Sequence, residues 1–227
     1  MRGARLTVKA LPQQDFAPAP RIFRFFDAMN VTHAHAPASW PPDAQYGAAT
    51  PGKIGMWIFL VSDAFSFGGL LIAQGILRSR SPEWVQPGEP ALGIPFTAAL
   101  TFLLISSSFT NVMAWAAAAE GRRRAAAVLL AVTALGGLLF LVGQYVEWTT
   151  LLREGLVFGR SPRASTFFVT TGFHGLHVLV GVAYILTVLR QYVRGRATAH
   201  HIELLGLYWC FVDFVWIFVF SFVYLMP

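Results

Sequence analysis

Long apolar runs alternate with short polar breaks along most of the chain. An α-helix needs about 20 mainly apolar residues to cross the hydrocarbon core of a bilayer, which is roughly 30 Å thick. Five runs reach this length, and they predict transmembrane helices at about 53–78, 92–118, 125–151, 165–190 and 203–226. The breaks between them contain Pro, Gly and Arg, as in GRRR at 121–124. The pattern therefore predicts an all-α membrane bundle of five transmembrane helices.

Composition excludes several other classes of protein. The chain is 56% hydrophobic and 12% charged, whereas soluble domains contain about 25% charged residues. The net charge of +6 does not indicate nucleic-acid binding, because the basic residues separate apolar segments and do not interleave with aromatics on a polar face. The single cysteine, Cys210, lies inside an apolar run, so this chain alone can build neither a disulfide framework nor a thiolate metal site.

The basic residues predict the orientation of the bundle. Residues 1–52 are rich in Pro and Ala, and we expect them to form a cytoplasmic tail before a transmembrane domain at 53–227. Most of the 17 Lys and Arg residues lie in or beside this tail, the break near 119–124 and the break near 191–202. Because Lys and Arg near span ends are retained on the cytoplasmic side, we predict the N-terminus inside and the C-terminus outside.

Four ionisable residues lie deep inside predicted spans: Asp63, His174, His177 and Asp213. Each costs at least about 2.5 kcal/mol in hydrocarbon, and each lies about 15 Å into its helix. His174 and His177 are three residues apart, so we expect them to share a helix face and to pair with a carboxylate of a neighbouring helix. We favour a structural hydrogen-bond cluster, with proton handling as the first alternative. A metal site is the weakest interpretation, because neither helix carries the Glu-x-x-His pattern of di-iron bundles.

A second set of polar residues lies near the predicted span ends. Gln144 and Glu147 fall near the outer end of the third span, where we expect headgroups and water to reach the carboxylate. His200 and His201 precede Glu203 at the inner end of the fifth span. A carboxylate in a first turn favours the positive end of the helix dipole, so helix capping explains Glu203.

Two further patterns concern packing. Aromatic rings are abundant in the fifth span, and we expect rings such as Trp209 and Trp216 to face lipid or a neighbouring subunit. Small residues recur at helical spacing in the first span, at Ser62, Ser66 and Gly69, and in the second span, at Thr97, Thr101 and Ser108. Small residues permit close contact between helices in lipid, so we expect packing there.

Two long motifs in the fourth and fifth spans are specific. They read STFFVTTGFHGLHV at 165–178 and YWCFVDFVW at 208–216. Upstream, GMWIFLVSD at 55–63 ends in Asp63, and Gln144 with Glu147 forms a Gln-x-x-Glu pair. Together these segments resemble subunit III of the heme-copper respiratory oxidases, and the resemblance covers about residues 53–227.

The chain departs from that family's pattern in three respects. Mitochondrial-type members have seven helices, so a chain with five resembles the shorter bacterial form. Asp63 stands where cytochrome c oxidases usually have Glu, and it resembles the Asp of bacterial quinol oxidases. Cys210 replaces a His of the family's motif, so any role that needs that imidazole is absent.

The resemblance implies a non-catalytic subunit of a proton-pumping cytochrome c oxidase in the bacterial inner membrane. Such a subunit stabilises subunit I and supports proton uptake during the reduction of oxygen to water. It implies no cofactor or metal in this chain, heme and copper in the partner subunits, and room for bound phospholipid. It also implies contact with subunit I, association with subunit II, and membership of a respiratory supercomplex as an option.

Three alternatives stay open. Subunit III of a quinol oxidase differs only in the electron donor, and an accessory protein of nitric oxide reductase belongs to the same family. A stand-alone transporter would use Asp63, His174, His177 and Asp213 as its substrate site. No internal repeat is visible in the sequence, which argues against the duplicated halves of many transporters.

Overall fold

The computed structural model describes residues 50–226. Nearly all of the predicted cytoplasmic tail lies outside the described residues. Five helices in the described part are long and apolar enough to cross a membrane, which confirms the predicted bundle. Their bounds are α2 Pro51–Arg80, α3 Ile94–Ala119, α4 Arg123–Arg153, α5 Pro162–Val193 and α6 Ala199–Val219, and α6 continues into a π-helix, η1, at Phe220–Leu225.

Local sequence signals fix the helix ends. At the start of α5, the Ser161 side chain accepts a hydrogen bond from the Ala164 N–H at 3.0 Å, and Pro162 occupies the first helical position. Thr50 and Pro51 begin α2 in the same way. At the ends of α3 and α5, Gly121 and Gly195 adopt positive φ angles of 76° and 75°. Glycine adopts this conformation without a steric penalty, so both helices end there.

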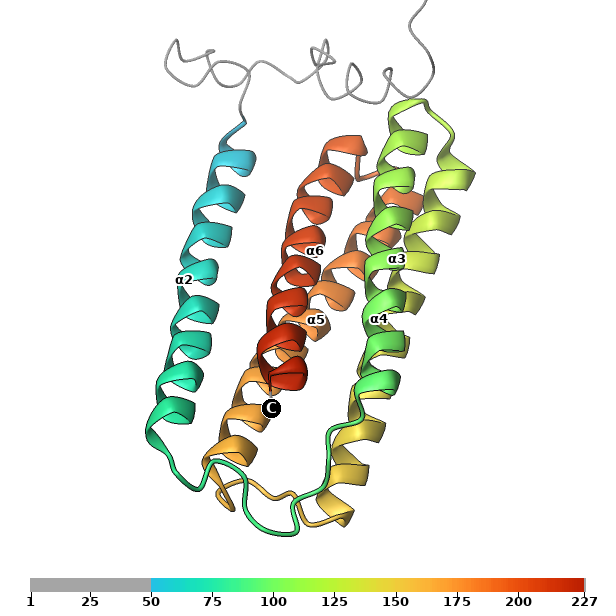
Figure 1. Cartoon of the computed structure of the whole chain (residues 1–227). Helices are drawn as coiled ribbons and strands as arrows, with labels where there is room; N and C mark the ends of the chain where they lie inside the picture. Colours follow the sequence, from blue (N-terminus) through green and yellow to red (C-terminus); the bar gives the residue numbers. More distant parts are fainter. Residues whose placement is uncertain (1–49, 227) are drawn as a thin grey trace, which may run out of the picture. The chain divides into compact units, whose positions relative to one another are not determined.

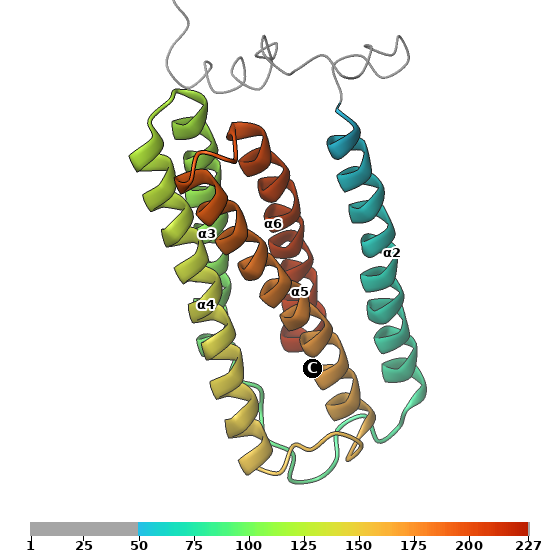
Figure 2. The ribbon, with the colours of Figure 1, turned by 180° about the vertical axis from the view of Figure 1, so that it is seen from behind.

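The helices alternate in direction, and α2 stands at one edge. Figure 1 shows α6 between α2 and α3, and Figure 2 shows α5 between α2 and α4. α3 packs most extensively against α4, whereas α2 packs against α5 and α6. One end of the bundle therefore carries the start of α2, the α3–α4 turn and the α5–α6 turn, and the other end carries the α2–α3 and α4–α5 loops.

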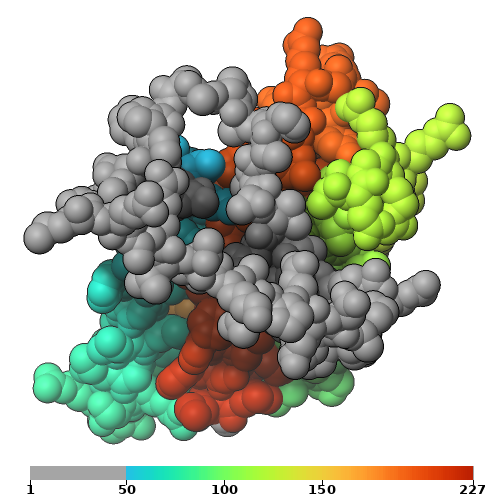
Figure 3. Space-filling model, turned by 90° about the horizontal axis from the view of Figure 1, so that it is seen from above, coloured from blue at the N-terminus to red at the C-terminus, as the bar shows by residue number. Residues whose placement is uncertain are grey.

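The two turns at the first end are joined by a basic residue. In Figure 3 the α3–α4 turn and the C-terminal end of α5 lie side by side. Arg123 Nη2 donates to the Tyr192 carbonyl oxygen at 3.0 Å, and its guanidinium lies 5.5 Å from the centre of the Tyr192 ring. This contact combines a charge-assisted hydrogen bond with a cation–π interaction.

The core contains the tryptophans of α6. Trp209 and Trp216 are fully buried, so the expectation that they face lipid or another subunit is wrong. Glycines make room for Trp209, because a Cβ added at Gly137 or Gly181 would lie only 2.6 or 2.7 Å from its ring. The indole N–H of Trp209 donates to Ser107 Oγ at 3.0 Å. A buried polar ring atom is thereby satisfied inside an apolar core.

The small residues of α2 are not part of that core. Ser62 and Ser66 are exposed and donate to backbone oxygens of their own helix, at Ile58 and Ser62. A Cβ added at Gly69 would meet nothing within 4 Å. Within the described residues, the close packing expected at these positions is therefore not made.

Candidate functional site

The Asp63 carboxylate and the His177 imidazole form a pair between α2 and α5. Asp63 Oδ1 lies 3.3 Å from His177 Nε2, and the other ring nitrogen, Nδ1, lies 2.7 Å from the Phe173 carbonyl oxygen. The two side chains are mostly buried, with 9% of Asp63 and 14% of His177 exposed. The Tyr208 hydroxyl donates to the His177 carbonyl oxygen at 2.9 Å and joins α6 to the same turn of α5.

His174 does not join this pair, although it lies only three residues away. Its Nε2 lies 3.2 Å from the Val212 carbonyl oxygen, and its ring is fully buried. The rings of Phe140 and Trp216 lie 5.7 and 4.6 Å away. Because a carbonyl oxygen only accepts, Nε2 carries the proton and the ring is held as an internal packing element. The expectation that both histidines pair with carboxylates is therefore wrong for His174.

Asp213 forms a separate polar group with α3. The Ser108 hydroxyl donates to Asp213 Oδ2, and Oδ1 has no hydrogen-bond partner among the described residues. Asp213 is 5% exposed. The predicted cluster of four residues is thus divided into the Asp63–His177 pair and the Ser108–Asp213 pair, with His174 bonded to the backbone of α6.

A third buried carboxylate, Glu147, is enclosed by donors. Thr97 Oγ1 lies 2.8 Å from Oε1, while Gln144 Nε2 and the Tyr224 hydroxyl lie 3.1 and 2.9 Å from Oε2. Glu147 is 5% exposed, so it is not the water-accessible interfacial group that we expected. The Gln-x-x-Glu spacing identified Gln144, whereas the sequence gives no signal that Thr97 and Tyr224 complete the group.

The residues in the first turns of α6 contact the start of α2. Lys53 Nζ lies 2.6 Å from Glu203 Oε1, and His200 Nδ1 lies 3.4 Å from Glu203 Oε2. Thr50 Oγ1 lies 3.2 Å from His200 Nε2. Glu203 is therefore one partner of an ion pair between helices, and capping alone does not explain it. The side chain of His201 caps the helix, since its Nδ1 accepts from the Thr198 N–H at 3.2 Å.

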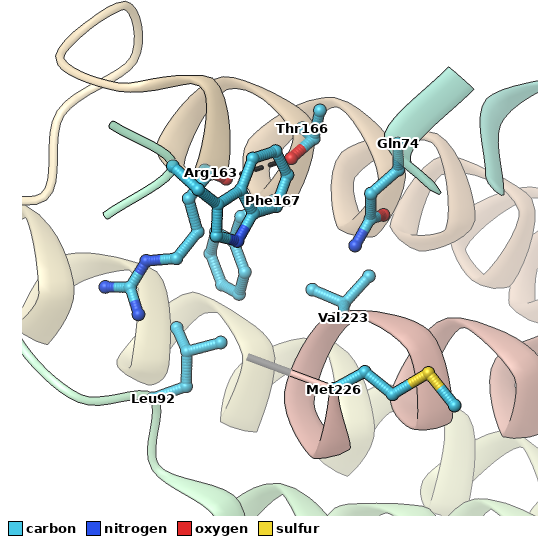
Figure 4. Close-up of a pocket in the computed structure, with 8 residues that line it drawn as sticks. Gln74, Leu92, Arg163, Thr166, Phe167, Val223 and Met226 are labelled. Atoms are coloured by element: carbon cyan, nitrogen blue, oxygen red, sulfur yellow. Dashed lines mark hydrogen bonds between the residues drawn. The ribbon is translucent and has the colours of Figure 1, made fainter. Parts of the chain in front are cut away.

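A small cavity lies at the opposite end of the bundle, which the sequence did not predict. Figure 4 shows its lining, which is formed by Gln74, Trp84, Leu92, Arg163, Thr166, Phe167, Val223 and Met226. The cavity of about 10 Å³ has room for no more than a water molecule. Arg163 donates to Glu89 Oε2 at 3.0 Å and to the Pro90 carbonyl oxygen at 2.7 Å. These contacts hold the α2–α3 loop over the end of the bundle.

The buried carboxylates and histidines of the described residues can form hydrogen bonds and exchange protons. Between residues 50 and 226, no three His, Cys, Asp or Glu side chains are grouped closely enough to hold a metal ion. Asp63 and His177 supply two groups, whereas zinc sites use three or four protein ligands.

The comparisons with known proteins agree with the motifs. The model of the family described as cytochrome c oxidase subunit III matches residues 45–227. Cytochrome c oxidase subunit 3 of Synechocystis sp. is 40% identical over 176 residues, which cover 76% of this chain and 74% of that protein. Cytochrome c oxidase subunit 3 of Thermostichus vulcanus is 34% identical over 207 residues, which cover 88% and 94%.

A third relative is named as a subunit of a quinol oxidase, and its sequence identity to this chain is similar. Quinol oxidase subunit 3 of Bacillus spizizenii is 34% identical over 200 residues, which cover 86% of this chain and 98% of that protein. The three relatives are matched over 74%, 94% and 98% of their own lengths, and the chain has the five membrane-length helices described above. The chain therefore belongs to the cytochrome c oxidase subunit III family of the heme-copper oxidases.

Proposed function

We propose that this chain is the non-catalytic subunit III of a proton-pumping cytochrome c oxidase in a bacterial inner membrane. Its work is to stabilise subunit I and to support proton uptake while the complex reduces oxygen to water. Heme and copper belong to the partner subunits in this proposal. The observation that carries it is the family match over residues 45–227.

The basic end of the bundle is the proposed site of proton uptake. It combines Lys53, His200 and Glu203 in one hydrogen-bonded group, and the α3–α4 turn adds Arg122, Arg123 and Arg124. Lys and Arg near span ends are retained on the cytoplasmic side, so this end faces inward and the C-terminus faces outward. Carboxylate and imidazole groups that lie near water can accept protons and pass them on.

Quinol is the alternative electron donor. The similarity to the quinol oxidase subunit of Bacillus spizizenii and the presence of Asp63 at the position of the family's buried carboxylate favour it. An accessory protein of nitric oxide reductase and a stand-alone transporter have no observation of their own in their favour.

Purification of the tagged chain in mild detergent tests the proposal. We expect a heme-copper subunit I to co-purify, with the absorption spectrum of heme and with oxygen consumption. Reduced cytochrome c should sustain that consumption, whereas activity with quinol alone selects the alternative donor. A folded, colourless chain without a heme-copper partner would overturn the proposal.

A further inference from the structure

The outward side of α6 forms an open apolar surface together with the adjoining sides of α2 and α3. We name it the α6 face. Phe214, Ile217 and Phe218 are exposed on it, and α6 lies between the two flanking helices in Figure 1. An open groove of about 230 Å³ runs between α2 and α6, lined by Ala64, Phe67, Gly68, Leu71, Phe211, Phe214, Val215 and Phe218.

The α6 face also carries a polar spot at mid-membrane depth. Ser108 is half-buried, Cys210 is exposed, and the Cys210 thiol lies beside Ser108. Ser108 donates to Asp213, which leaves the lone pairs of its hydroxyl oxygen able to accept a further hydrogen bond. Ser108 and Asp213 each lie about 21 Å from the start of their helices. Polar groups at this depth are costly against lipid, so the spot favours cover by protein.

The outward side of α4 differs from the α6 face. Every exposed residue between 128 and 142 is Ala, Val or Leu. Such a surface needs no polar partner, and hydrocarbon chains solvate it as well as another helix would. The outward side of α4 therefore suits lipid, whereas the α6 face suits a protein neighbour.

We propose that the α6 face is the docking site for a transmembrane helix of the oxidase subunit that holds this chain, and that this helix presents a hydrogen-bond donor to Ser108. The inference rests on the proposed function and assigns the partner's place on the chain. An acyl chain could fill the apolar groove, but it has no donor at mid-membrane depth. A helix can fill the groove with its side chains and satisfy the Ser108–Asp213 pair with an Arg, Lys, His, Trp or hydroxyl donor.

Photo-crosslinking in intact membranes tests this placement. A benzophenone amino acid replaces Cys210 on the α6 face or, as the control, Leu135 on α4. These positions lie about 17 and 18 Å from the same end of the bundle, and both are exposed. We expect position 210 to yield a covalent adduct with a heme-copper oxidase subunit, and position 135 to yield lipid adducts.

The possible failures are distinguishable. If the oxidase co-purifies but position 210 yields lipid adducts alone, the α6 face is lipid-covered and the inference is wrong while the proposed function stands. A protein adduct at position 135 in place of 210 also overturns the inference. If no heme-copper subunit co-purifies, the proposed function fails and the inference fails with it.

The hydrogen-bond donor has its own test. Ser108→Ala should lower retention of the chain in the complex during a detergent wash by about three- to tenfold, the range for one hydrogen bond between membrane helices. Ser106→Ala is the matched control on α3, because Ser106 donates to the Phe102 carbonyl oxygen of its own helix. Thermal unfolding of each isolated variant checks folding. Equal retention of the two folded variants would exclude the donor contact.

Discussion

The His177 imidazole lies between the Asp63 carboxylate of α2 and a backbone carbonyl oxygen of its own helix. Nδ1 of His177 faces the Phe173 carbonyl oxygen at 2.7 Å, and a carbonyl oxygen only accepts, so Nδ1 carries a hydrogen. Nε2 faces Asp63 Oδ1 at 3.3 Å. A hydrogen bond there requires a proton on either the imidazole or the carboxyl group, and in both cases the pair is neutral overall. A neutral pair is far less costly in hydrocarbon than a lone charge.

The first prediction concerns the loss of this pair. Asp63→Leu should lower the free energy of unfolding by about 1 kcal/mol, a usual value for a hydrogen bond between membrane helices. Asp63→Asn should retain most of that stability, because its amide can donate to His177 Nε2. Denaturant titration in detergent micelles measures both, with Ser62→Ala as the control on the exposed side of α2.

The asparagine variant also separates a structural role from proton transfer, because it cannot release a proton. If the pair is structural, an assembled oxidase containing Asp63→Asn should turn over at a rate close to that of the unmodified complex. An assembled variant that loses most of its turnover would show that protons pass through this pair.

The second prediction concerns Glu147. Tyr224→Phe removes one of its three donors and leaves a buried carboxylate oxygen with fewer hydrogen bonds, which should lower stability by about 1–3 kcal/mol. Tyr145→Phe is the control, because Tyr145 is 70% exposed on the neighbouring turn of α4. Thermal unfolding measures the difference. Equal stability of the two variants would mean that Gln144 and Thr97 satisfy Glu147 on their own.

The five helices were predictable because the information is local. An apolar run of sufficient length specifies a membrane helix without knowledge of its neighbours. The ends were less predictable, and α6 begins at Ala199 before the expected residue 203. The expected span placed His200 and His201 before the helix. They lie in its first turn, where the Thr198 N–H donates to His201 Nδ1.

The partners across helices were not predictable, for geometric reasons. Residues three apart differ by about 60° around a helix, which is enough to direct His177 toward Asp63 and His174 toward the backbone of α6. Tyr224 reaches Glu147 from the π-helical turn at Phe220–Leu225. A π-turn changes the rotation of the residues within it, and no pattern in the sequence indicates where the turn occurs.

The third prediction concerns the ion pair between Lys53 and Glu203. Lys53 and Glu203 are about one-quarter exposed, so solvent screening limits their interaction. A double-mutant cycle with Lys53→Met and Glu203→Gln should give a coupling of about 0.5–1 kcal/mol. The coupling should decrease as salt is added. A coupling that is insensitive to salt would contradict an electrostatic contact, and Arg122 with Glu120, a more exposed pair, is the comparison.

The last prediction concerns the glycines around Trp209. A methyl group at Gly137 would lie 2.6 Å from the Trp209 ring and 2.7 Å from Val182, and both of these side chains are buried. Gly137→Ala should therefore cost about 1–3 kcal/mol of stability, the range for overpacking in a close-packed core. Gly75→Ala on α2 is the control, because an added Cβ there meets nothing within 4 Å. Thermal unfolding of both variants decides the matter. If Gly137→Ala is as stable as Gly75→Ala, α4 and α6 can move apart at no cost, and Trp209 is not the fixed centre of this bundle.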